Sequence, residues 1–128
     1  MILLDTSVWL RYYHCLPLRK PLIQVIETAD ELLLCSISVW EVATKIRHGK
    51  LQVPPMAQWI EEALADYIVL PITAEIAREA GSDSMANQDP ADRLIVATAR
   101  IHDLELVHTD TKLRRLTTIR HRYFKNVQ

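Results

Sequence analysis

Four carboxylates in this sequence are spaced so that they could act together on one ligand. They share a position at the end of a predicted strand or in the first turn of a predicted helix, and they are Asp5, Glu41, Asp92 and Asp110. Ligands of open parallel sheets bind beyond the carboxyl ends of the strands, so we expect the four side chains to face one crevice. Clustered carboxylates raise each other's pKa, and a divalent cation relieves this repulsion. Because Mg²⁺ and Mn²⁺ prefer hard oxygen donors, the pattern predicts a site for one of these ions.

Each of the four acids also has an ordinary structural role, and that alternative stays open for any one of them. Ser38 and Glu41 fit a capping box, with Ser38 as the N-cap of a helix. Asp89 fits the N-cap of a helix that begins at Pro90, where the helix dipole also favours Asp92. The other two acids precede threonine and could cap turns. A shared site is favoured because all four acids fall at the same predicted edge of the sheet.

The elements that position these acids alternate between short apolar strands and helices. Strands are expected over residues 2–4, 32–35, 68–70, 104–109 and, at one edge, 119–124. A short helix or turn is expected over residues 8–13. Further helices are expected over residues 22–28, 39–48 before Gly49, 55–64, 74–81 after a Thr73 cap, 90–102 and, as a short helix, 111–116. This alternation favours a parallel sheet covered on both faces. The predicted fold is therefore a single α/β domain over residues 1–128, a three-layer α/β/α sandwich.

The composition is typical of one globular domain. The chain has 128 residues, of which 49% are hydrophobic and 24% are charged. Two cysteines are too few for a disulfide framework, and two glycines exclude a glycine-rich phosphate loop. No apolar run approaches the ~20 residues of a membrane span, and the first residues lack the basic leader of a signal peptide. We therefore expect a cytoplasmic protein with no membrane partner.

Four motifs, in chain order, resemble those of PIN-domain ribonucleases. They read Asp-Thr-Ser at 5–7, Ser-Val-Trp-Glu-Val at 38–42, Asp-Pro-Ala-Asp-Arg-Leu-Ile at 89–95 and Leu-Val-His-Thr-Asp at 106–110. The resemblance extends over nearly the whole chain and points in particular to the VapC-like toxins of toxin–antitoxin pairs. Carried over residue by residue, it implies that the catalytic and metal-binding residues are Asp5, Glu41, Asp92 and Asp110. It further implies supporting roles for Thr6, Ser7, Asp89 and Thr109.

The resemblance also implies an activity and partners. The activity is that of an endoribonuclease, dependent on Mg²⁺ or Mn²⁺, that hydrolyses RNA to a 5′-phosphate and a 3′-hydroxyl. The implied partners are the RNA substrate, an antitoxin protein and a second copy of the chain in a homodimer. Residues 9–13, which are rich in aromatic side chains, are expected in antitoxin and dimer contacts.

Two positions depart from the motifs of these toxins. Asn87 stands where the toxins often have histidine, and His108 stands where they usually have threonine. Asn87 can still form hydrogen bonds, whereas His108 changes the surroundings of Asp110. These departures leave an alternative, in which a catalytically silent PIN-like domain binds RNA or a protein partner without cutting.

Lys45 and the basic residues near the C-terminus each allow two interpretations. Arg93 is the one basic residue that the sequence places beside the acids. Lys45 fits either a solvated helix end or a contact to phosphate. Residues 111–128 carry six basic and no acidic side chains, whereas the preceding 110 residues carry 9 basic and 16 acidic ones. This basic tail could steer an RNA backbone towards the acidic crevice, or it could hold an acidic antitoxin segment.

Overall fold

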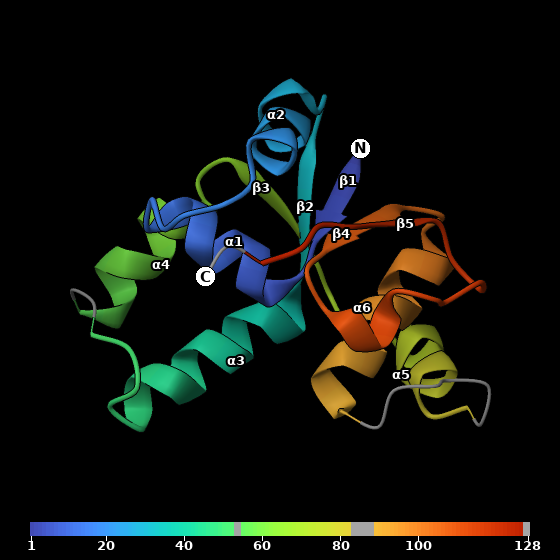
Figure 1. Cartoon of the computed structure of the whole chain (residues 1–128). Helices are drawn as coiled ribbons and strands as arrows, with labels where there is room; N and C mark the ends of the chain where they lie inside the picture. The colour runs from blue at the N-terminus through green and yellow to red at the C-terminus, as the bar shows by residue number, and fades with distance from the viewer. Residues whose placement is uncertain (53–54, 83–88, 127–128) are drawn as a thin grey trace.

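The computed structural model describes residues 1–52, 55–82 and 89–126, which form a five-stranded sheet in the order β3-β2-β1-β4-β5 (Figure 1). The strands are β1 (Ile2–Leu4), β2 (Leu32–Cys35), β3 (Tyr67–Leu70), β4 (Glu105–His108) and β5 (His121–Tyr123). Every neighbouring pair is parallel, which confirms the predicted sheet. The strand order changes direction between β1 and β4, and α/β sheets bind ligands at such a switch point.

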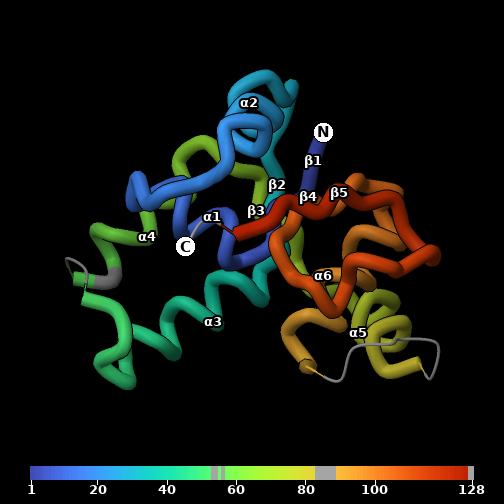
Figure 2. The backbone as a smooth tube through the Cα atoms, viewed as in Figure 1, coloured from blue at the N-terminus to red at the C-terminus, as the bar shows by residue number. Residues whose placement is uncertain are grey.

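Helices cover both faces of this sheet. They are α1 (Thr6–Tyr13), α2 (Lys20–Thr28), α3 (Ser36–Arg47), α4 (Met56–Leu64), α5 (Ala74–Ala80), α6 (Pro90–Ile101) and the 3₁₀ helix η1 (Thr111–Leu113). Figures 1 and 2 place α5 and α6 on one side of the sheet and α1, α2 and α4 on the other. The arrangement is the predicted α/β/α sandwich.

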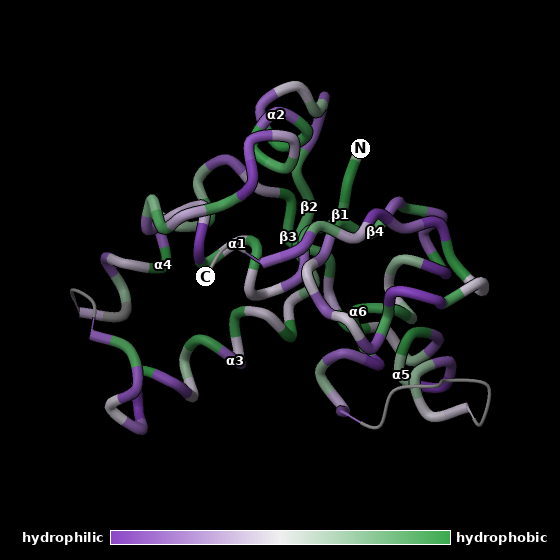
Figure 3. Tube along the Cα trace, in the orientation of Figure 1, coloured by the Kyte–Doolittle hydropathy of each residue, from purple (hydrophilic) through white to green (hydrophobic). Residues whose placement is uncertain are grey.

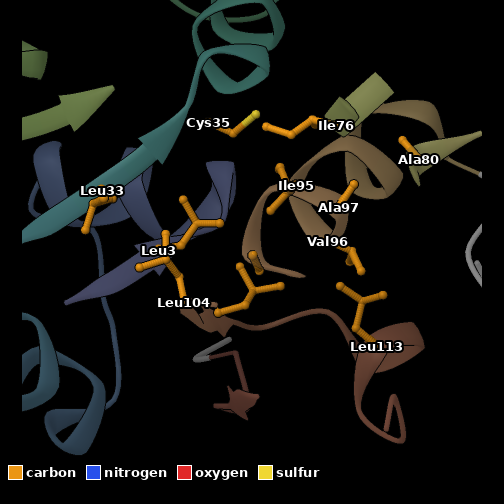
Figure 4. Close-up of a cluster of buried hydrophobic side chains, with 12 residues drawn as sticks. Leu3, Leu33, Cys35, Ile76, Ala80, Ile95, Val96, Ala97, Leu104 and Leu113 are labelled. Atoms are coloured by element: carbon orange, nitrogen blue, oxygen red, sulfur yellow. The ribbon is translucent and has the colours of Figure 1, made fainter. Parts of the chain in front are cut away.

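The strands divide their side chains between two cores. On β1, Leu3 packs with Ile76 of α5 and Ile95 of α6 (Figure 4). Leu4 points to the opposite face, where it belongs to a second core with Trp9. Successive strand residues point to opposite faces, so a strand that is buried on both sides must be apolar throughout. Figure 3 shows β1 and β2 to be hydrophobic along their length.

Two of the three tryptophans are core residues. Trp9 is fully buried, and its Nε1 donates to the backbone oxygen of Ala63 at 3.0 Å. Its ring centroid lies 5.7 Å from that of Trp59, which is also buried. Within the segment 9–13, Trp9 is therefore a core residue and not a surface available for the antitoxin and dimer contacts expected there. Trp40, by contrast, is 59% exposed on α3.

The two ends of α3 differ in how well the sequence predicted them. The predicted capping box is wrong, because Cys35 is the N-cap and Ser38 lies buried inside the helix. β2 leads directly into α3, so the helix begins at Ser36 and the Ser38 hydroxyl is used for a tertiary contact instead. The predicted stop is confirmed, since Gly49 has a φ of 71° and donates its N–H to Ile46 at 3.0 Å.

Other predicted boundaries shift by a few residues. The strand predicted over 104–109 is limited to β4, and the helix predicted over 111–116 is the shorter η1. Thr73 caps α5 as predicted, accepting the Ile76 N–H at 3.2 Å. Residues 83–88, which include Asn87, lie outside the described residues. Both cysteines are free thiols. In the described ranges no helix has the length and apolar character needed to cross a bilayer.

Candidate active site

The switch point of the sheet places Asp5 and Asp110 at the ends of neighbouring strands. β1 and β4 are parallel, with Leu4 paired to Val107, and the Asp5 N–H continues the ladder by donating to Val107 at 3.1 Å. Asp5 is also the N-cap of α1, and its Oδ1 accepts the Val8 N–H at 2.8 Å. The sequence prediction that strand ends bring these two acids together is consistent with this register.

Asp110 and Asp92 reach the same edge from η1 and α6. Asp110 is the N-cap of η1, and its Oδ1 accepts the Lys112 N–H at 2.8 Å. Asp92 lies in the first turn of α6, which Asp89 caps by accepting the N–H groups of Ala91 at 2.9 Å and of Asp92 at 3.2 Å. Asp89 therefore has the structural role that the sequence allowed for it, and it holds the turn that carries Asp92.

Glu41 is held by a chain of hydroxyl groups that joins α1 to α3. The Thr6 hydroxyl donates to Glu41 Oε1 at 2.5 Å, and it lies 2.7 Å from the Ser38 hydroxyl. Because the single Thr6 proton is given to Glu41, Ser38 must be the donor to Thr6. Thr6 and Ser38 are both buried. The supporting role that was expected of Thr6 thus has a specific geometry, whereas the role of Ser38 was not predicted.

One polar pocket of about 390 Å³ collects these side chains. The resemblance gave eight residues a catalytic, metal-binding or supporting role. Seven of them line the pocket, namely Asp5, Thr6, Ser7, Glu41, Asp92, Thr109 and Asp110. Asp89 is the residue that does not line it. Lys45, Thr111 and Asn126 complete the wall. The four acids therefore surround a common space.

The Asp5 carboxyl group is electrostatically strained in this pocket. The pKa of Asp5 is raised to about 7, chiefly by burial and in the same direction by the charges of Asp92 and Asp110. The hydrogen bonds from the Val8 and Thr109 N–H groups act in the opposite direction, the second of them reaching Asp5 Oδ2 over 3.4 Å. A group that carries this repulsion near neutral pH gains from a nearby cation.

The oxygen atoms that line the pocket are of the chemical types that bind a hard divalent cation. Four carboxylates and several hydroxyl and amide oxygens line the pocket, and Mg²⁺ and Mn²⁺ take such donors. Among residues 1–52, 55–82 and 89–126, no three Asp, Glu, His or Cys side chains are already grouped closely enough to hold a metal ion. The acids therefore line a shared pocket without forming a ready-made coordination shell.

Of the two basic side chains singled out near the acids, Lys45 lines the pocket and Arg93 does not. The Arg93 guanidinium donates from Nε to the backbone oxygen of Ala80 at 2.7 Å and from a terminal nitrogen to that of Ser82 at 2.5 Å, which ties α6 to the end of α5. Lys45 lies one helical turn after Glu41 and lines the pocket. The i, i+4 spacing of Glu41 and Lys45 was the available signal for this placement.

Comparison with known proteins gives one family and several relatives. A profile of the PIN domain matches residues 2–118. The chain is 38% identical over 93 residues to Ribonuclease VapC22 of Mycobacterium tuberculosis, a match that covers 71% of this chain and 72% of the relative.

Solved structures with a similar fold include a chain of a toxin–antitoxin complex. A complex from Klebsiella pneumoniae matches with a TM-score of 0.70 and 20% identity, covering 93% of this chain and 95% of that one. FitAcB from Neisseria gonorrhoeae gives a TM-score of 0.69 and 22% identity, covering 94% and 96%. VapBC2 from Rickettsia felis, bound to a promoter DNA fragment, gives 0.67 and 16%, covering 96% and 98%.

Proposed function

This chain belongs to the PIN-domain family, and on that premise we propose that it is a metal-dependent endoribonuclease that acts as the toxin of a toxin–antitoxin pair. The observation that carries the proposal is the pocket at the switch point of the sheet, which all four predicted acids line. The identity to a relative named as a ribonuclease supports the activity, and the fold shared with chains of toxin–antitoxin complexes supports the toxin role. Cellular RNA as the substrate implies that the protein acts in the cytoplasm.

In this proposal the four acids hold Mg²⁺ or Mn²⁺. A divalent cation of this kind lowers the pKa of a bound water and stabilises charge on a phosphodiester. Asp5 is kept in place by the N–H groups of Val8 and Thr109, and Glu41 is kept in place by the Thr6 hydroxyl. Two of the proposed metal ligands, Asp5 and Glu41, are thereby held in position by helices and strands of the fold. Side chains held by such supporting hydrogen bonds bind metals in a defined geometry.

Lys45 is the basic residue best placed to bind the RNA backbone. It lines the acidic pocket, it is exposed, and it forms no ion pair within the part of the chain that the structure describes. The basic tail contributes less than its charge suggests, because Arg120 pairs with Asp103 at 3.3 Å and Arg122 with Glu105 at 3.2 Å. We therefore assign the phosphate contact nearest the acids to Lys45.

An apolar groove offers a binding site for the antitoxin. The groove has a volume of about 960 Å³ and lies between α1, α2, α4 and β3. Apolar side chains form part of its lining, among them Leu16, Leu18, Ile23, Ile26 and Ile68. Five carboxylates and no lysine or arginine complete it, the acids being Glu27, Asp30, Glu31, Glu62 and Asp66. By charge complementarity, we propose that the groove binds an amphipathic antitoxin segment with basic residues along its polar face.

We also propose that the chain forms a homodimer, as the family resemblance implies. The measurement is the molar mass in solution, by light scattering on a size-exclusion column. A monomeric mass at micromolar concentration would count against this part of the proposal.

The test of the activity uses purified protein, structured RNA and Mn²⁺, with the Asp5→Asn variant in parallel. Asparagine keeps an oxygen that can accept the Val8 N–H, so the variant removes charge while it preserves the cap. We expect cleavage by the wild-type protein and loss of cleavage in the variant. Equal cleavage by both proteins, or none by either across several RNAs and metals, contradicts the proposal. RNA binding without cleavage by the wild type would favour the silent alternative.

A further inference from the structure

A second hydrogen-bonded chain, made of two histidines, ends at the backbone of Asp110. His108 is the last residue of β4 and is fully buried, and His121 is the first residue of β5 beside it. The His108 Nε2 lies 2.8 Å from the His121 Nδ1. The Asp110 N–H donates to the His108 Nδ1 at 3.2 Å, and the His121 Nε2 lies 2.7 Å from the backbone oxygen of Leu116.

The two ends of this chain determine where every proton lies. A backbone N–H can only donate, so the His108 Nδ1 is an acceptor and its ring proton is on Nε2. A backbone carbonyl can only accept, so the His121 Nε2 is a donor and its Nδ1 is free to accept. The His108 Nε2–H therefore donates to the His121 Nδ1. Both rings are neutral in this arrangement, and each ring nitrogen has one partner.

We infer that His108 and His121 are positioning residues for Asp110, acting through the Asp110 N–H. Asp110 lies at the start of η1, and its carboxylate is held on one side by the Lys112 N–H at 2.8 Å. The bond to His108 fixes the peptide from which that carboxylate extends. The inference about catalysis rests on the proposed function, whereas the inference about the hydrogen bonds does not.

The surroundings of the pair favour a specific positioning role over simple filling of the core. The His108 backbone oxygen accepts the Phe124 N–H at 2.9 Å. The centroid of the His108 ring lies 5.9 Å from the centroid of the Tyr123 ring. β5 thus supplies both the second ring and part of the packing around the first. His121 in turn connects the pair to the segment after η1 through Leu116. The pair therefore ties both sides of the Asp110 turn to the edge of the sheet.

Two substitutions at position 108 separate the bond to Asp110 from the bond to His121. In His108→Asn the side-chain oxygen takes the place of Nδ1 and can accept the Asp110 N–H. In His108→Gln the side-chain amide takes the place of Nε2 and can donate to His121, but nothing accepts from Asp110. His102→Ala serves as the control, because His102 ends α6 and is exposed. The free energy of unfolding is measured for each variant so that all are compared in the folded state.

We expect His108→Gln to weaken Mn²⁺ binding and lower kcat by about tenfold or more, with the KM for RNA little changed. His108→Asn should recover most of both values, although it also loses the bond to His121. The exchange rate of the Asp110 amide proton reports the bond without metal or RNA. It should be slow in the wild type and in His108→Asn, and faster in His108→Gln. Nitrogen NMR of the rings should show the proton of each histidine on Nε2.

Three outcomes would overturn the inference. Protonation of the His108 Nδ1 is one, and equal amide exchange in the Asn and Gln variants is another. The third is an unchanged Mn²⁺ affinity and kcat in folded His108→Gln. If the wild type cleaves no RNA, the proposed function fails instead, and amide exchange together with the ring NMR still decides whether the pair holds Asp110.

Discussion

The hydroxyl group of Thr6 donates to Oε1 of Glu41 over 2.5 Å, and this bond joins the first turn of α1 to the first half of α3. Thr6 follows Asp5 directly, so adjacent residues contribute one carboxylate to the pocket and orient a second. Thr6 in turn accepts from Ser38, which lies one helical turn before Glu41 on the same helix. Two elements far apart in the sequence are thereby locked together beside the acids.

Thr6→Val should lower RNA cleavage by about 10- to 100-fold, because it leaves Glu41 without its donor and Ser38 without its acceptor. The loss of the buried hydroxyl should also cost about 1–3 kcal/mol of stability. The measurements are kcat at saturating Mn²⁺ and the free energy of unfolding in urea. Thr6→Ser keeps the hydroxyl and should remain close to the wild type.

Thr44→Val is the matched control for this substitution. The Thr44 hydroxyl donates to the backbone oxygen of Trp40 in its own helix and does not line the pocket. Its replacement should leave kcat unchanged. If Thr6→Val and Thr44→Val have the same activity, the bond between Thr6 and Glu41 has no part in catalysis.

Asp5→Asn should stabilise the metal-free fold at pH 8 by up to about 4 kcal/mol. The folded pKa of Asp5 is raised from 3.8 to about 7, so this group costs the wild type increasing stability as the pH rises from 4 to 7. The full cost is present above pH 7, and it disappears below pH 3.8, where the carboxyl group becomes protonated in the unfolded state as well. Urea unfolding of both proteins at pH 4.5 and pH 8 measures the difference.

Mn²⁺ should reverse the order of the two proteins. A cation that binds the ionised Asp5 stabilises the wild type in proportion to its concentration, and the variant gains less. A difference between the proteins that does not change with pH would show that Asp5 is not strained. An equal rise of Tm with Mn²⁺ in both would show that Asp5 is not a ligand.

The candidate acids were predictable because they follow from local rules. A strand end and a helix start can be read from apolar runs and from Pro90, and parallel strands bring their ends to one edge. The supporting side chains were not predictable in this way. Ser38 was misassigned because a serine before a glutamate is a common capping pattern, whereas its true partner belongs to α1. That contact depends on how two helices pack across the sheet.

The same limit applies to His108 and His121. Their contact requires that β5 be parallel to β4 with Leu106 opposite His121, a register that no local pattern specifies. Asn126 reaches the pocket through the segment after β5, again by tertiary placement. The fold class and the candidate acids were therefore accessible from the sequence, and the hydrogen bonds that orient these acids were not.

Lys45→Ala should weaken RNA binding and reduce the dependence of log K on log salt concentration by about one. The reason is that Lys45 lines the pocket and forms no ion pair among the described residues, so its charge is available to a phosphate. Binding is measured in the Asp92→Asn background, which prevents cleavage. Arg47→Ala, two residues further along α3 and outside the pocket lining, is the control. Identical salt dependence of RNA binding in the two variants would show that Lys45 makes no phosphate contact and is only a solvated residue at the end of the helix.

Reversal of charge beside the groove should slow antitoxin binding. Asp30 and Glu31 line the groove and are exposed, so the double variant Asp30→Lys, Glu31→Lys changes its charge without disturbing the core. We expect an association rate about tenfold lower at low salt, with the difference shrinking as salt is added, because charges at the rim act mainly through steering. The measurement is the association of the co-expressed antitoxin by surface plasmon resonance.

Glu75→Lys provides the control for this experiment, since Glu75 is exposed on α5 and does not line the groove. Its association rate should match that of the wild type. RNA cleavage by the free double variant should also be normal, because the groove and the carboxylate pocket share no residue. If the double variant binds the antitoxin at the wild-type rate at every salt concentration, the acidic groove is not where the antitoxin docks.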